Sequence, residues 1–405
     1  MLSLNISHYS KPSAYRVSEL PKPCLANSKD VIIKVYAAGI NPIDVKRAAG
    51  ALKLAVGFPY KIGYDCSGII TETGRDVKKF NIGDAVYVKL PEVSRVAKNT
   101  FPYLLKRNLG LCSEFVRCSE AHIASKPPCL SFEEAASIPL AAMTAHQALH
   151  LYRGDLSGKT VFVPAGLPIH PHCRRGTQVV FLFHTCFANV GIVSGTGLFA
   201  CQLAKHVFRA GRVIPTVSTA KIPKIKELLG ANTVDEMIDY TKFDPRDVIE
   251  HGTVDFLFDT AGLAMKLLCL MRPGSSRIVS VSTMPSGNQL QDSPLMDLAH
   301  RPTVPFAFRM GLNLLDQIRK VRAHRYKTEY SYLFLESTGK DLDELKQYIE
   351  DGRLRRVIGT IADIRDSEAV QKACDVVYSG RGGLGKLVIR VCTPEQSFQS
   401  EFDFR

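Results

Sequence analysis

Hydrophobic and polar positions follow two different patterns along the chain. Up to about residue 125, short β-rich runs are separated by Gly and Pro turns, and 31–40 (VIIKVYAAGI) is a clear example. Strands at this spacing predict a small barrel. From residue 131 onward, near-continuous apolar runs alternate with amphipathic stretches. That alternation predicts a doubly wound parallel sheet with helices on its faces, so the fold class is α/β plus β.

The second pattern begins with a helix signal. Ser131 is followed three residues later by Glu134, which is the spacing of a capping box. The apolar runs after it predict strands at 161–166, 212–219, 254–262, 276–283, 330–335 and 386–391. The amphipathic stretches between them predict helices at 197–211, 221–231, 264–274, 306–327 and 341–352.

The region 161–205 carries a split glycine motif. VFVPAGL (161–167) and SGTGLFACQLAK (194–205) together give an apolar strand, a glycine-rich turn and a helix, which is the order that a Rossmann unit needs to bind a pyrophosphate. Gly166, Gly195 and Gly197 would allow the tight turn and the close approach of the backbone to the ligand. The following helix would add the dipole of its N-terminus. The motif predicts a dinucleotide site.

Segment 168–193 separates the two halves of this motif and shares none of its character. Its flanks would join cleanly in frame, so we interpret it as a translated retained intron or a gene-model error. A rival interpretation makes 179–183 or 189–193 the first strand of the sheet. That alternative needs a long detour before the strand, which compact domains rarely contain. We expect the segment to loop out and to weaken cofactor binding, because one turn must wrap the pyrophosphate.

Composition and charge narrow the class of protein. A chain of 405 residues is long enough for two domains, and 45% hydrophobic with 22% charged residues is ordinary for a globular protein. No apolar run reaches the roughly 18–20 residues of a membrane span. The N-terminus has no targeting pattern, and the 11 cysteines include no CxxC pair, which favours reduced thiols in the cytoplasm. The net charge of +13 is mostly spread out, and its densest cluster, 319–327, fits a solvated helix face better than a nucleic-acid site.

Seven segments in this order resemble the medium-chain dehydrogenase/reductase superfamily, and more closely its zinc-free quinone-oxidoreductase branch with the reticulon-4-interacting-protein-like reductases. The resemblance covers about 3–392, apart from 168–193. It implies a GroES-like catalytic domain formed by 1–126 and by a C-terminal return at 354–405, with a Rossmann NADPH-binding domain at 127–353. The segments are AAGINPIDVKRAAG (37–50), GYDCSGII (63–70), GDAVY (83–87), LSFEEAASIPLAAMTAHQAL (130–149), SGTGLFACQLAK (194–205), VDFLFDTAG (254–262) and GKLVIRV (385–391).

The resemblance also bears on metals. Zinc-dependent relatives place a Cys and a Gly-His-Glu at positions that correspond to the Ile40-Asn41 region and to Gly63-Tyr64-Asp65, and neither ligand is present. The four-Cys lobe is missing as well. His146 and His150 are four residues apart on a predicted helix, but with no third ligand in view we favour packing roles for them. His170, His172 and Cys173 lie in the anomalous segment, so the sequence predicts no metal.

Without a Lewis acid, hydride addition to a conjugated carbonyl or a quinone is easier than chemistry on simple alcohols, because the acceptor spreads the developing charge. The strand at 212–219 has no acidic residue at its tip, whereas Ser218 and Lys221 offer a donor and a positive charge, so NADPH is the expected cofactor. A solvated Lys221 is an equally good alternative. The counterpart of Tyr240 in the family lies near the same phosphate. The predicted cofactor-binding residues are Thr144, Gly166, Gly195, Thr196, Gly197, Ser218, Lys221, Tyr240, Thr260 and Ser280.

The predicted catalytic residues are Asn41, Asp44 and Tyr64. Asn41 and Asp44 belong to the sequence NPID, which matches a family motif that lines the cleft, and Asn41 can donate to a carbonyl oxygen. Tyr64 takes the place of a lost zinc ligand and can deliver a proton. The structural alternatives are a plain Asn-Pro turn and a packed aromatic ring with a satisfied hydroxyl.

The resulting hypothesis is an NADPH-dependent reductase of a small-molecule quinone or α,β-unsaturated carbonyl, without zinc. Two alternatives stay open: a stand-alone enoyl reductase of a polyketide or fatty-acid pathway, and a catalytically dead nucleotide-binding protein with an interrupted phosphate turn. A cytoplasmic location is expected, without nucleic-acid or membrane-spanning roles, and a homodimer is one option for the assembly.

Overall fold

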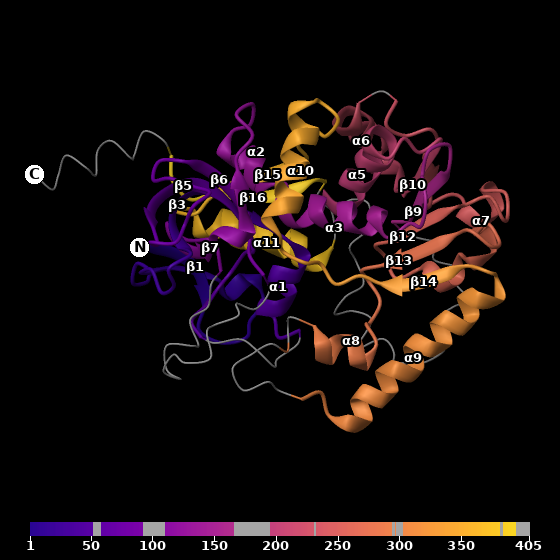
Figure 1. Ribbon diagram of the computed structural model, residues 1–405, viewed down its shortest axis with the longest axis horizontal. Helices are drawn as coiled ribbons and strands as arrows, with labels where there is room; N and C mark the ends of the chain where they lie inside the picture. Colours follow the sequence, from indigo (N-terminus) through magenta and orange to yellow (C-terminus); the bar gives the residue numbers. More distant parts are fainter. Residues whose placement is uncertain are drawn as a thin grey trace, which may run out of the picture.

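The computed structural model describes residues 1–51, 58–91, 110–165, 195–230, 232–293, 296, 303–380 and 384–393. Gly166 and the whole of segment 168–193, on which several of the sequence predictions rest, lie outside these ranges. The described elements form two groups that lie side by side, one built around a mixed sheet and one around a parallel sheet (Figure 1).

The mixed group contains a seven-stranded and a three-stranded sheet. In the larger sheet the C-terminal strand β16 pairs antiparallel with β3, so that Leu387 lies opposite Ile40. The end of the chain therefore completes a sheet that its beginning started. The strands of this sheet, in spatial order, are β15 (Ile358–Asp363), β16 (Lys386–Arg390), β3 (Asp30–Ile40), β5 (Asp65–Thr73), β6 (Ala85–Lys89) and β8 (Ile123–Ser125), with β7 (Phe115–Ser119) paired to β3. The small sheet contains β2 (Arg16–Glu19), β1 (Leu2–Ile6) and β4 (Tyr60–Lys61).

The second group is a six-stranded sheet in which every pairing is parallel. Numbered by their order along the chain, its strands run 3-2-1-4-5-6, the order of a Rossmann sheet. This sheet, together with the mixed group, confirms the predicted fold class. In spatial order the strands are β11 (Ile238–Asp239), β10 (Arg212–Val217), β9 (Thr160–Val163), β12 (Phe256–Asp259), β13 (Arg277–Ser280) and β14 (Glu329–Tyr332). The domain boundaries at 126 and 353 stay predictions.

Helices cover the sheets much as the periodicity predicts. The capping box is confirmed: the side chain of Ser131 accepts from the backbone of Glu134, and the Glu134 carboxylate accepts from the backbone of Ser131. The single helix predicted at 264–274 is wrong, because the chain makes two short 3-10 turns there, at Ala264–Lys266 and Leu268–Leu270. The α-helices are α1 (Pro42–Ala48), α2 (Phe132–Ala136), α3 (Pro139–His150), α5 (Gly195–Gln202), α6 (Ile222–Leu229), α7 (Pro245–Val248), α8 (Gly287–Asp292), α9 (Phe306–Arg325), α10 (Gly339–Glu350) and α11 (Ser367–Ser379).

Strand β9 and helix α5 occupy the places of the first strand and first helix of the Rossmann sheet. β9 lies between β10 and β12 at the centre of the sheet, and α5 packs against α3 and both of the strands β9 and β10. The rival interpretation, in which 179–183 or 189–193 forms the first strand, is therefore wrong, because Thr160–Val163 already fills that position.

A large apolar core joins the two groups. Buried side chains of α3 and α5 pack together with those of the parallel sheet, and Tyr87 of β6 and Ala124 of β8 belong to the same cluster. The tyrosine hydroxyl donates across the boundary to the backbone oxygen of Leu342 in α10. Among the described residues, no helix is long and apolar enough to cross a membrane.

Candidate active site

A buried lysine connects the mixed sheet to the start of helix α5. Lys386 begins β16, and it is 4% exposed. A Cβ atom added to Gly195 would come within 2.8 Å of Lys386 Cγ and 2.9 Å of its Cδ, so only glycine fits beside the lysine stem. The first residue of helix α5 and the residues of the mixed sheet therefore meet at this point.

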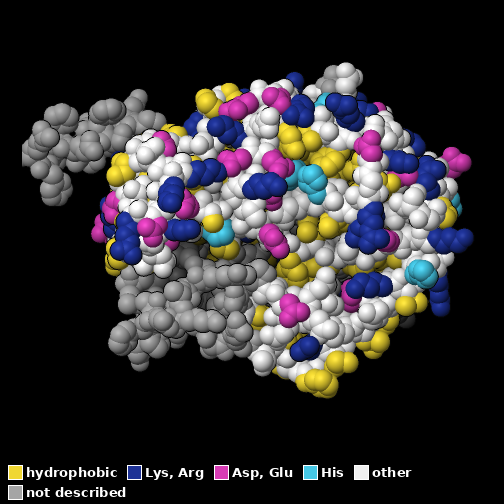
Figure 2. Space-filling model, in the orientation of Figure 1, with side chains coloured by type: hydrophobic (Ala, Val, Ile, Leu, Met, Phe, Trp, Pro, Cys, Tyr) yellow, Lys and Arg dark blue, Asp and Glu magenta, His cyan; other side chains and the backbone are white. Residues whose placement is uncertain are grey.

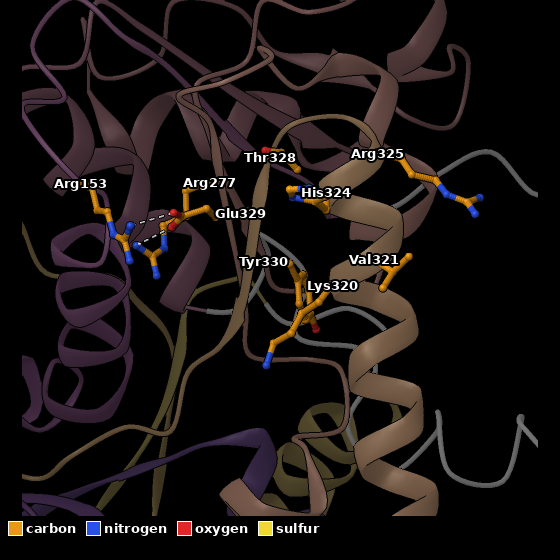
Figure 3. A pocket seen from close by; sticks show the side chains of 9 residues that line it. All are labelled: Arg153, Arg277, Lys320, Val321, His324, Arg325, Thr328, Glu329 and Tyr330. Carbon is orange, nitrogen blue, oxygen red and sulfur yellow. Dashed lines mark hydrogen bonds and ion pairs between the residues drawn. The ribbon is translucent and has the colours of Figure 1, made fainter.

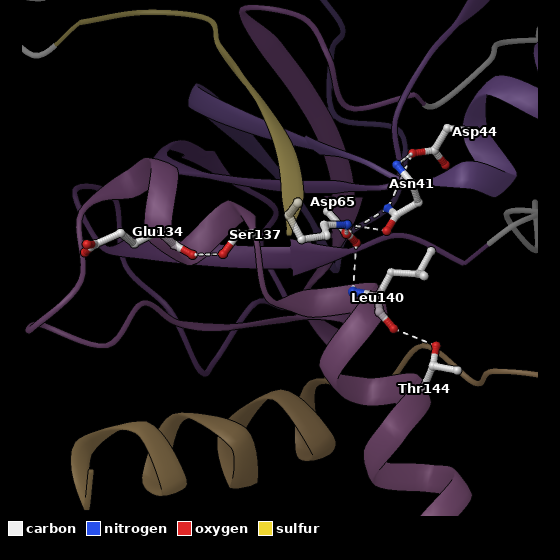
Figure 4. A network of polar contacts seen from close by, with 8 residues as sticks. Asn41, Asp44, Asp65, Glu134, Ser137, Leu140 and Thr144 are labelled. Carbon is white, nitrogen blue, oxygen red and sulfur yellow. Dashed lines mark hydrogen bonds and ion pairs between the residues drawn. The ribbon is translucent and has the colours of Figure 1, made fainter. Parts of the chain in front are cut away.

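The ammonium group of Lys386 lies against Asn41 and Asp65. Its Nζ donates to Asn41 Oδ1 and, over 3.2 Å, to Asp65 Oδ2. The Asn41 amide nitrogen in turn donates to Asp65 Oδ2 over 2.9 Å. Asn41 and Asp65, which lie together in Figure 4, are 1% and 0% exposed, so with Lys386 they form a desolvated ion pair with a bridging amide. An ammonium has three donors, and one of the three has no partner among the described residues.

Asp65 also connects this network to helix α3. Its Oδ1 accepts the backbone N–H of Leu140 over 3.0 Å, in the first turn of that helix. Thr144, one turn further, donates from its hydroxyl to the Leu140 carbonyl over 2.6 Å (Figure 4). A carboxylate at a helix N-terminus is stabilised by the unpaired N–H groups and the helix dipole there. Helix α3 therefore fixes the carboxylate that holds the lysine.

Asp44 joins the network through its hydrogen bonds with Asn41. It is fully buried, and its Oδ2 accepts from the Asn41 backbone over 2.7 Å and from the Asn41 amide over 3.4 Å (Figure 4). Burial, with repulsion from Asp65 as a second cause, raises the pKa of Asp44 to about 7. Its other oxygen, Oδ1, has no hydrogen-bond partner among the described residues. Asp44 is the third residue of helix α1, and its carboxylate holds Asn41, the N-cap of that helix.

The amide of Asn41 is occupied on both of its atoms. The nitrogen donates to two carboxylates and the oxygen accepts from Lys386. In this arrangement the amide has no free donor for a substrate carbonyl, which was the role that we predicted for Asn41. It positions Lys386 and Asp65 instead.

Tyr64 lies next to Asp65 in the chain, but its hydroxyl contacts Tyr60. It lies 3.2 Å from the Tyr60 hydroxyl, and the ring of Tyr64 is 5.7 Å from the Arg47 guanidinium and 5.9 Å from the Lys89 ammonium. Tyr64 is 6% exposed, and burial raises the pKa of its partner Tyr60 well above the ordinary value. The contacts with two cations suit a packed aromatic ring at least as well as a proton donor.

The glycine turn residues that the structure describes lie in one place. Gly195, Thr196 and Gly197 form the first turn of α5 and are buried. A Cβ on Gly195 would also lie 3.4 Å from the Cβ of Ala141 in α3, one turn from Thr144. The structure thus brings these four predicted residues together at the carboxyl end of β9, where a Rossmann sheet binds its dinucleotide. Gly166 lies outside the described residues.

Thr260 and Ser280 lie on the expected edge, at the carboxyl ends of β12 and β13, but their side chains are fully buried. The Ser280 hydroxyl donates to Asp259 Oδ2 over 3.0 Å, and the Thr260 hydroxyl donates to the Pro164 carbonyl over 3.3 Å. Burial raises the pKa of Asp259, and the serine hydrogen bond partly offsets that shift. The two side chains therefore hold the strand ends in place instead of pointing to a ligand.

Ser218, Lys221 and Tyr240 surround the end of strand β10. Ser218 precedes the turn Thr219–Lys221, and the Tyr240 backbone N–H donates to Val217 over 3.0 Å. The Lys221 ammonium makes no ion pair or hydrogen bond with other described residues, and burial lowers its pKa.

One acidic residue that the sequence prediction overlooked reaches this end of the sheet. Asp239 lies at the end of β11, paired with Val217, and its carboxylate accepts from the Thr219 hydroxyl over 2.5 Å. Burial acts to raise the pKa of Asp239, but hydrogen bonds from Thr219 and Thr241 outweigh it and the pKa is lowered. The negative charge of Asp239 is thus held by the hydroxyls of Thr219 and Thr241, with the Lys242 ammonium 3.9 Å away.

A basic pocket of about 530 Å³ lies elsewhere (Figure 3). Arg277 and Glu329 stand at the amino ends of β13 and β14, opposite the edge that carries Ser280. Arg153 and Arg277 both pair with Glu329, over 2.9 and 3.2 Å. The pocket is therefore not the predicted cofactor site. It is lined by Arg153, Arg277, Lys320, Val321, His324, Arg325, Thr328, Glu329 and Tyr330.

The basic cluster at 319–327 is partly used inside the molecule. Lys320 pairs with Asp316 over 2.6 Å, and Arg319 and Arg322 donate to the backbone oxygens of Met284 and Met265. These contacts are compatible with the predicted role of the cluster as one face of a helix. The expectation that the protein has no nucleic-acid role stays a prediction.

Sequence reasoning missed Lys386 and Asp65 as site residues. Lys386 stood in one of the matching segments, GKLVIRV, where a cation at the start of an apolar strand was the available signal. Its partner Asn41 is 345 residues away in the chain, and only the pairing of β16 with β3 brings the two together.

Comparison with known proteins agrees with this geometry. Residues 27–128 match the alcohol dehydrogenase GroES-like domain, and residues 230–389 match the zinc-binding dehydrogenase family. The chain belongs to the medium-chain dehydrogenase/reductase superfamily. A 2-methylene-furan-3-one reductase of Solanum lycopersicum is 33% identical over 250 residues, which cover 62% of this chain and 54% of the relative. The chain thus spans about half the length of that relative.

Two further proteins match over more of their length. The mouse (Mus musculus) NAD(P)H oxidoreductase RTN4IP1, mitochondrial, is 26% identical over 374 residues, 87% of this chain and 81% of the relative. The structure of a quinone oxidoreductase from Coxiella burnetii superposes with a TM-score of 0.67 at 26% identity, covering 97% of this chain and 99% of that one.

The cytoplasmic location expected from the sequence is wrong by this comparison. RTN4IP1 relatives that align over most of the chain, among them those of mouse, zebrafish and human, are named mitochondrial. The expectation rested on the lack of a recognisable targeting pattern, and that absence is weak ground for assigning a compartment.

Proposed function

We propose that this protein is an NADPH-dependent oxidoreductase that reduces a quinone or an α,β-unsaturated carbonyl without zinc. The observation that carries the proposal is the Lys386 ammonium, which is held by Asn41 and Asp65 while its stem packs on Gly195. One side chain thus connects a buried charged network with the start of the nucleotide-binding helix. The names of the relatives support the same reaction class: quinone oxidoreductase, NAD(P)H oxidoreductase and furanone reductase.

The residues present fit a nicotinamide dinucleotide. Gly195, Thr196 and Gly197 form the first turn of α5, where the helix dipole favours a pyrophosphate. Lys221 offers an ammonium that is unpaired among the described residues to a 2′-phosphate, with Ser218 and Tyr240 beside it. When bound, the cofactor supplies the hydride.

The role of the protein's own residues follows from the network. Lys386 has one N–H left after its two hydrogen bonds, so it can donate to the oxygen of a carbonyl acceptor, stabilise the charge that develops there as the hydride is added, and transfer its proton to that oxygen. Asp65 and Asn41 hold the lysine in place, and Asp44 holds Asn41. The ammonium beside Asp65 supplies the positive charge that a zinc ion supplies in zinc-dependent relatives.

Two variants test which group donates the proton. Lys386→Arg keeps the positive charge beside Asp65 but cannot release a proton, so we expect kcat for the quinone or enone to fall about 10²–10⁴-fold. Tyr64→Phe should keep kcat within about 10-fold of the wild type, because Tyr64 contacts Tyr60 rather than the lysine network. Cofactor titration and circular dichroism control for folding in both variants.

The reverse result would assign the proton to Tyr64 and overturn the role of Lys386. A loss of cofactor binding together with the loss of turnover in Lys386→Arg would show instead that the lysine supports the nucleotide site.

A mitochondrial location is part of the proposal, since the RTN4IP1 relatives carry that name. The homodimer is retained as a prediction. A stand-alone enoyl reductase remains the alternative activity, but the enoyl reductase structures are 18–20% identical to this chain and show the fold alone.

A further inference from the structure

Two histidines and a glutamate converge at the C-terminal half of α3, the helix whose first turn holds Asp65. His146 and His150 are one turn apart on α3, and their Nε2 atoms lie 2.9 Å from each other. Helix α10 packs against α3 and brings Glu344 Oε2 to 3.3 Å from His146 Nε2. Each residue thus directs one metal-binding atom to the same point, and all three atoms lie within 4.8 Å of one another.

Glu344 changes the prediction made from the sequence. No metal was expected because a third ligand for His146 and His150 was not in view. Glu344 lies almost two hundred positions further along the chain, and only the packing of α10 on α3 supplies it. Among the described residues, this is the only group of three or more His, Cys, Asp or Glu side chains placed to hold a metal ion.

The distances suit a small transition-metal ion. Bonds of 2.0–2.1 Å in tetrahedral geometry place neighbouring ligand atoms about 3.3 Å apart, close to the 2.9 and 3.3 Å found here. Two imidazole nitrogens and one carboxylate oxygen are ligands that Zn²⁺, Co²⁺ or Ni²⁺ prefer, whereas Mg²⁺ and Ca²⁺ prefer sites made of oxygen alone.

The surroundings hold the ligands and leave an entrance. His146 is 2% exposed, and the rings of Phe208 and Tyr348 pack near it and His150. His150 is exposed and the Glu344 side chain is 35% exposed, so the site opens to solvent on one side. Figure 2 shows histidine side chains at the surface in the region of α3 and α10. The buried side fixes geometry, and the open side leaves room for an ion and a water ligand.

We propose that His146, His150 and Glu344 bind a divalent transition-metal ion of the Zn²⁺ type, with water in the fourth position. The ion connects α3 with α10. The first turn of α3 holds Asp65 through Leu140, and α10 packs on β8 of the mixed sheet, so the metal stabilises the packing of two helices that both contact this sheet. The site is separate from the hydride chemistry, so the metal stabilises the fold and takes no part in turnover.

The test uses the full chain after treatment with a chelator. Co²⁺ is added and followed by its visible absorption, and Zn²⁺ is then used to displace it. We expect one equivalent of Co²⁺ to bind, and His150→Ala and Glu344→Gln each to weaken binding by at least about 10-fold. The control, His324→Ala, removes an exposed helical histidine outside the cluster and should bind as the wild type does.

Thermal unfolding supplies the second readout. Zn²⁺ should raise the melting temperature of the wild type and of His324→Ala, but not of His150→Ala or Glu344→Gln, since an ion that binds only the folded state stabilises it. The exposed thiols of Cys24 and Cys129 are shared by all four proteins, so the differences between variants report on the proposed site. Equal Co²⁺ affinity in wild type and His150→Ala, or no bound ion, would overturn the proposal.

Discussion

Asp44 shows most directly how a single buried residue can make stability depend on pH. Its carboxyl group has an ordinary pKa of 3.8, and burial, with Asp65 nearby, raises the pKa to about 7 in the folded protein. The folded state therefore holds this proton at pH values where the unfolded chain has lost it. Its contribution to stability is fully present below about pH 4 and is lost as the pH rises through about 7.

We expect Asp44→Asn to remove this pH dependence while keeping an acceptor for the Asn41 backbone. The stability of the wild type relative to the variant should fall between about pH 4 and 7, by at most about 4 kcal/mol at 1.36 kcal/mol per pKa unit. Urea unfolding across this pH range measures the difference. Asp366→Asn, at the exposed cap of helix α11, is the matched control. Parallel pH profiles for Asp44→Asn and the wild type would rule out the raised pKa.

At the residue scale, Lys221 is the side chain that we expect to distinguish the two nicotinamide cofactors. The Lys221 ammonium is unpaired among the described residues, and the negatively charged Asp239 is hydrogen-bonded to Thr219, two residues before Lys221. We expect Lys221→Ala to raise KM for NADPH about 10-fold and to leave KM for NADH almost unchanged, because a charge-assisted hydrogen bond to the 2′-phosphate is lost. Lys224→Ala, an exposed lysine of α6, is the control. Equal effects on both cofactors would contradict this role.

The sequence predicted correctly those helices and strands whose formation depends mainly on neighbouring residues. The Ser131–Glu134 capping box and the apolar strand ending at Val163 could be found from neighbouring residues alone. The stretch 264–274 was not predicted correctly, because leucine-rich periodicity does not distinguish one α-helix from two short 3-10 turns. Lys386 and Glu344 could not be assigned, since each depends on which strand or helix the fold places beside it.

Segment 168–193, which separates β9 from α5 in the sequence, gives a prediction of its own. The carboxyl end of β9 is held by a hydrogen bond from Ala165 N–H to the Thr216 hydroxyl over 2.7 Å, and the start of α5 is held by Lys386 and Ala141. Both flanks of the phosphate turn are thus in place. We expect a chain without 168–193 to bind NADPH at least about 10-fold more tightly, because one short turn can then wrap the pyrophosphate.

Fluorescence titration of NADPH against both chains measures the difference. Equal affinities would show that the segment does not disturb the cofactor site. Sequencing the transcript tests the origin of the segment separately: a message whose main form contains it would contradict the retained-intron hypothesis.

At the scale of the whole molecule, the strand order and the return of the C-terminus decide where chemistry can occur. The alternating pattern predicted a parallel sheet, and the order 3-2-1-4-5-6 follows the right-handed connections usual for such sheets. The pairing of β16 with β3 could not be predicted from local pattern alone, because strands far apart in sequence carry no local record of their partner. Yet this pairing places Lys386 beside Asn41 and Gly195.

The most direct test of the account is the rate of NADPH oxidation with a panel of quinones and enones, after removal of metal ions by a chelator. Chains with and without 168–193 are both measured. We expect turnover with at least one acceptor, a higher kcat/KM for NADPH than for NADH, and no loss of rate on chelation. No turnover with any acceptor in either chain, or turnover only after zinc is restored, would contradict a reductase whose buried lysine takes the place of a catalytic metal.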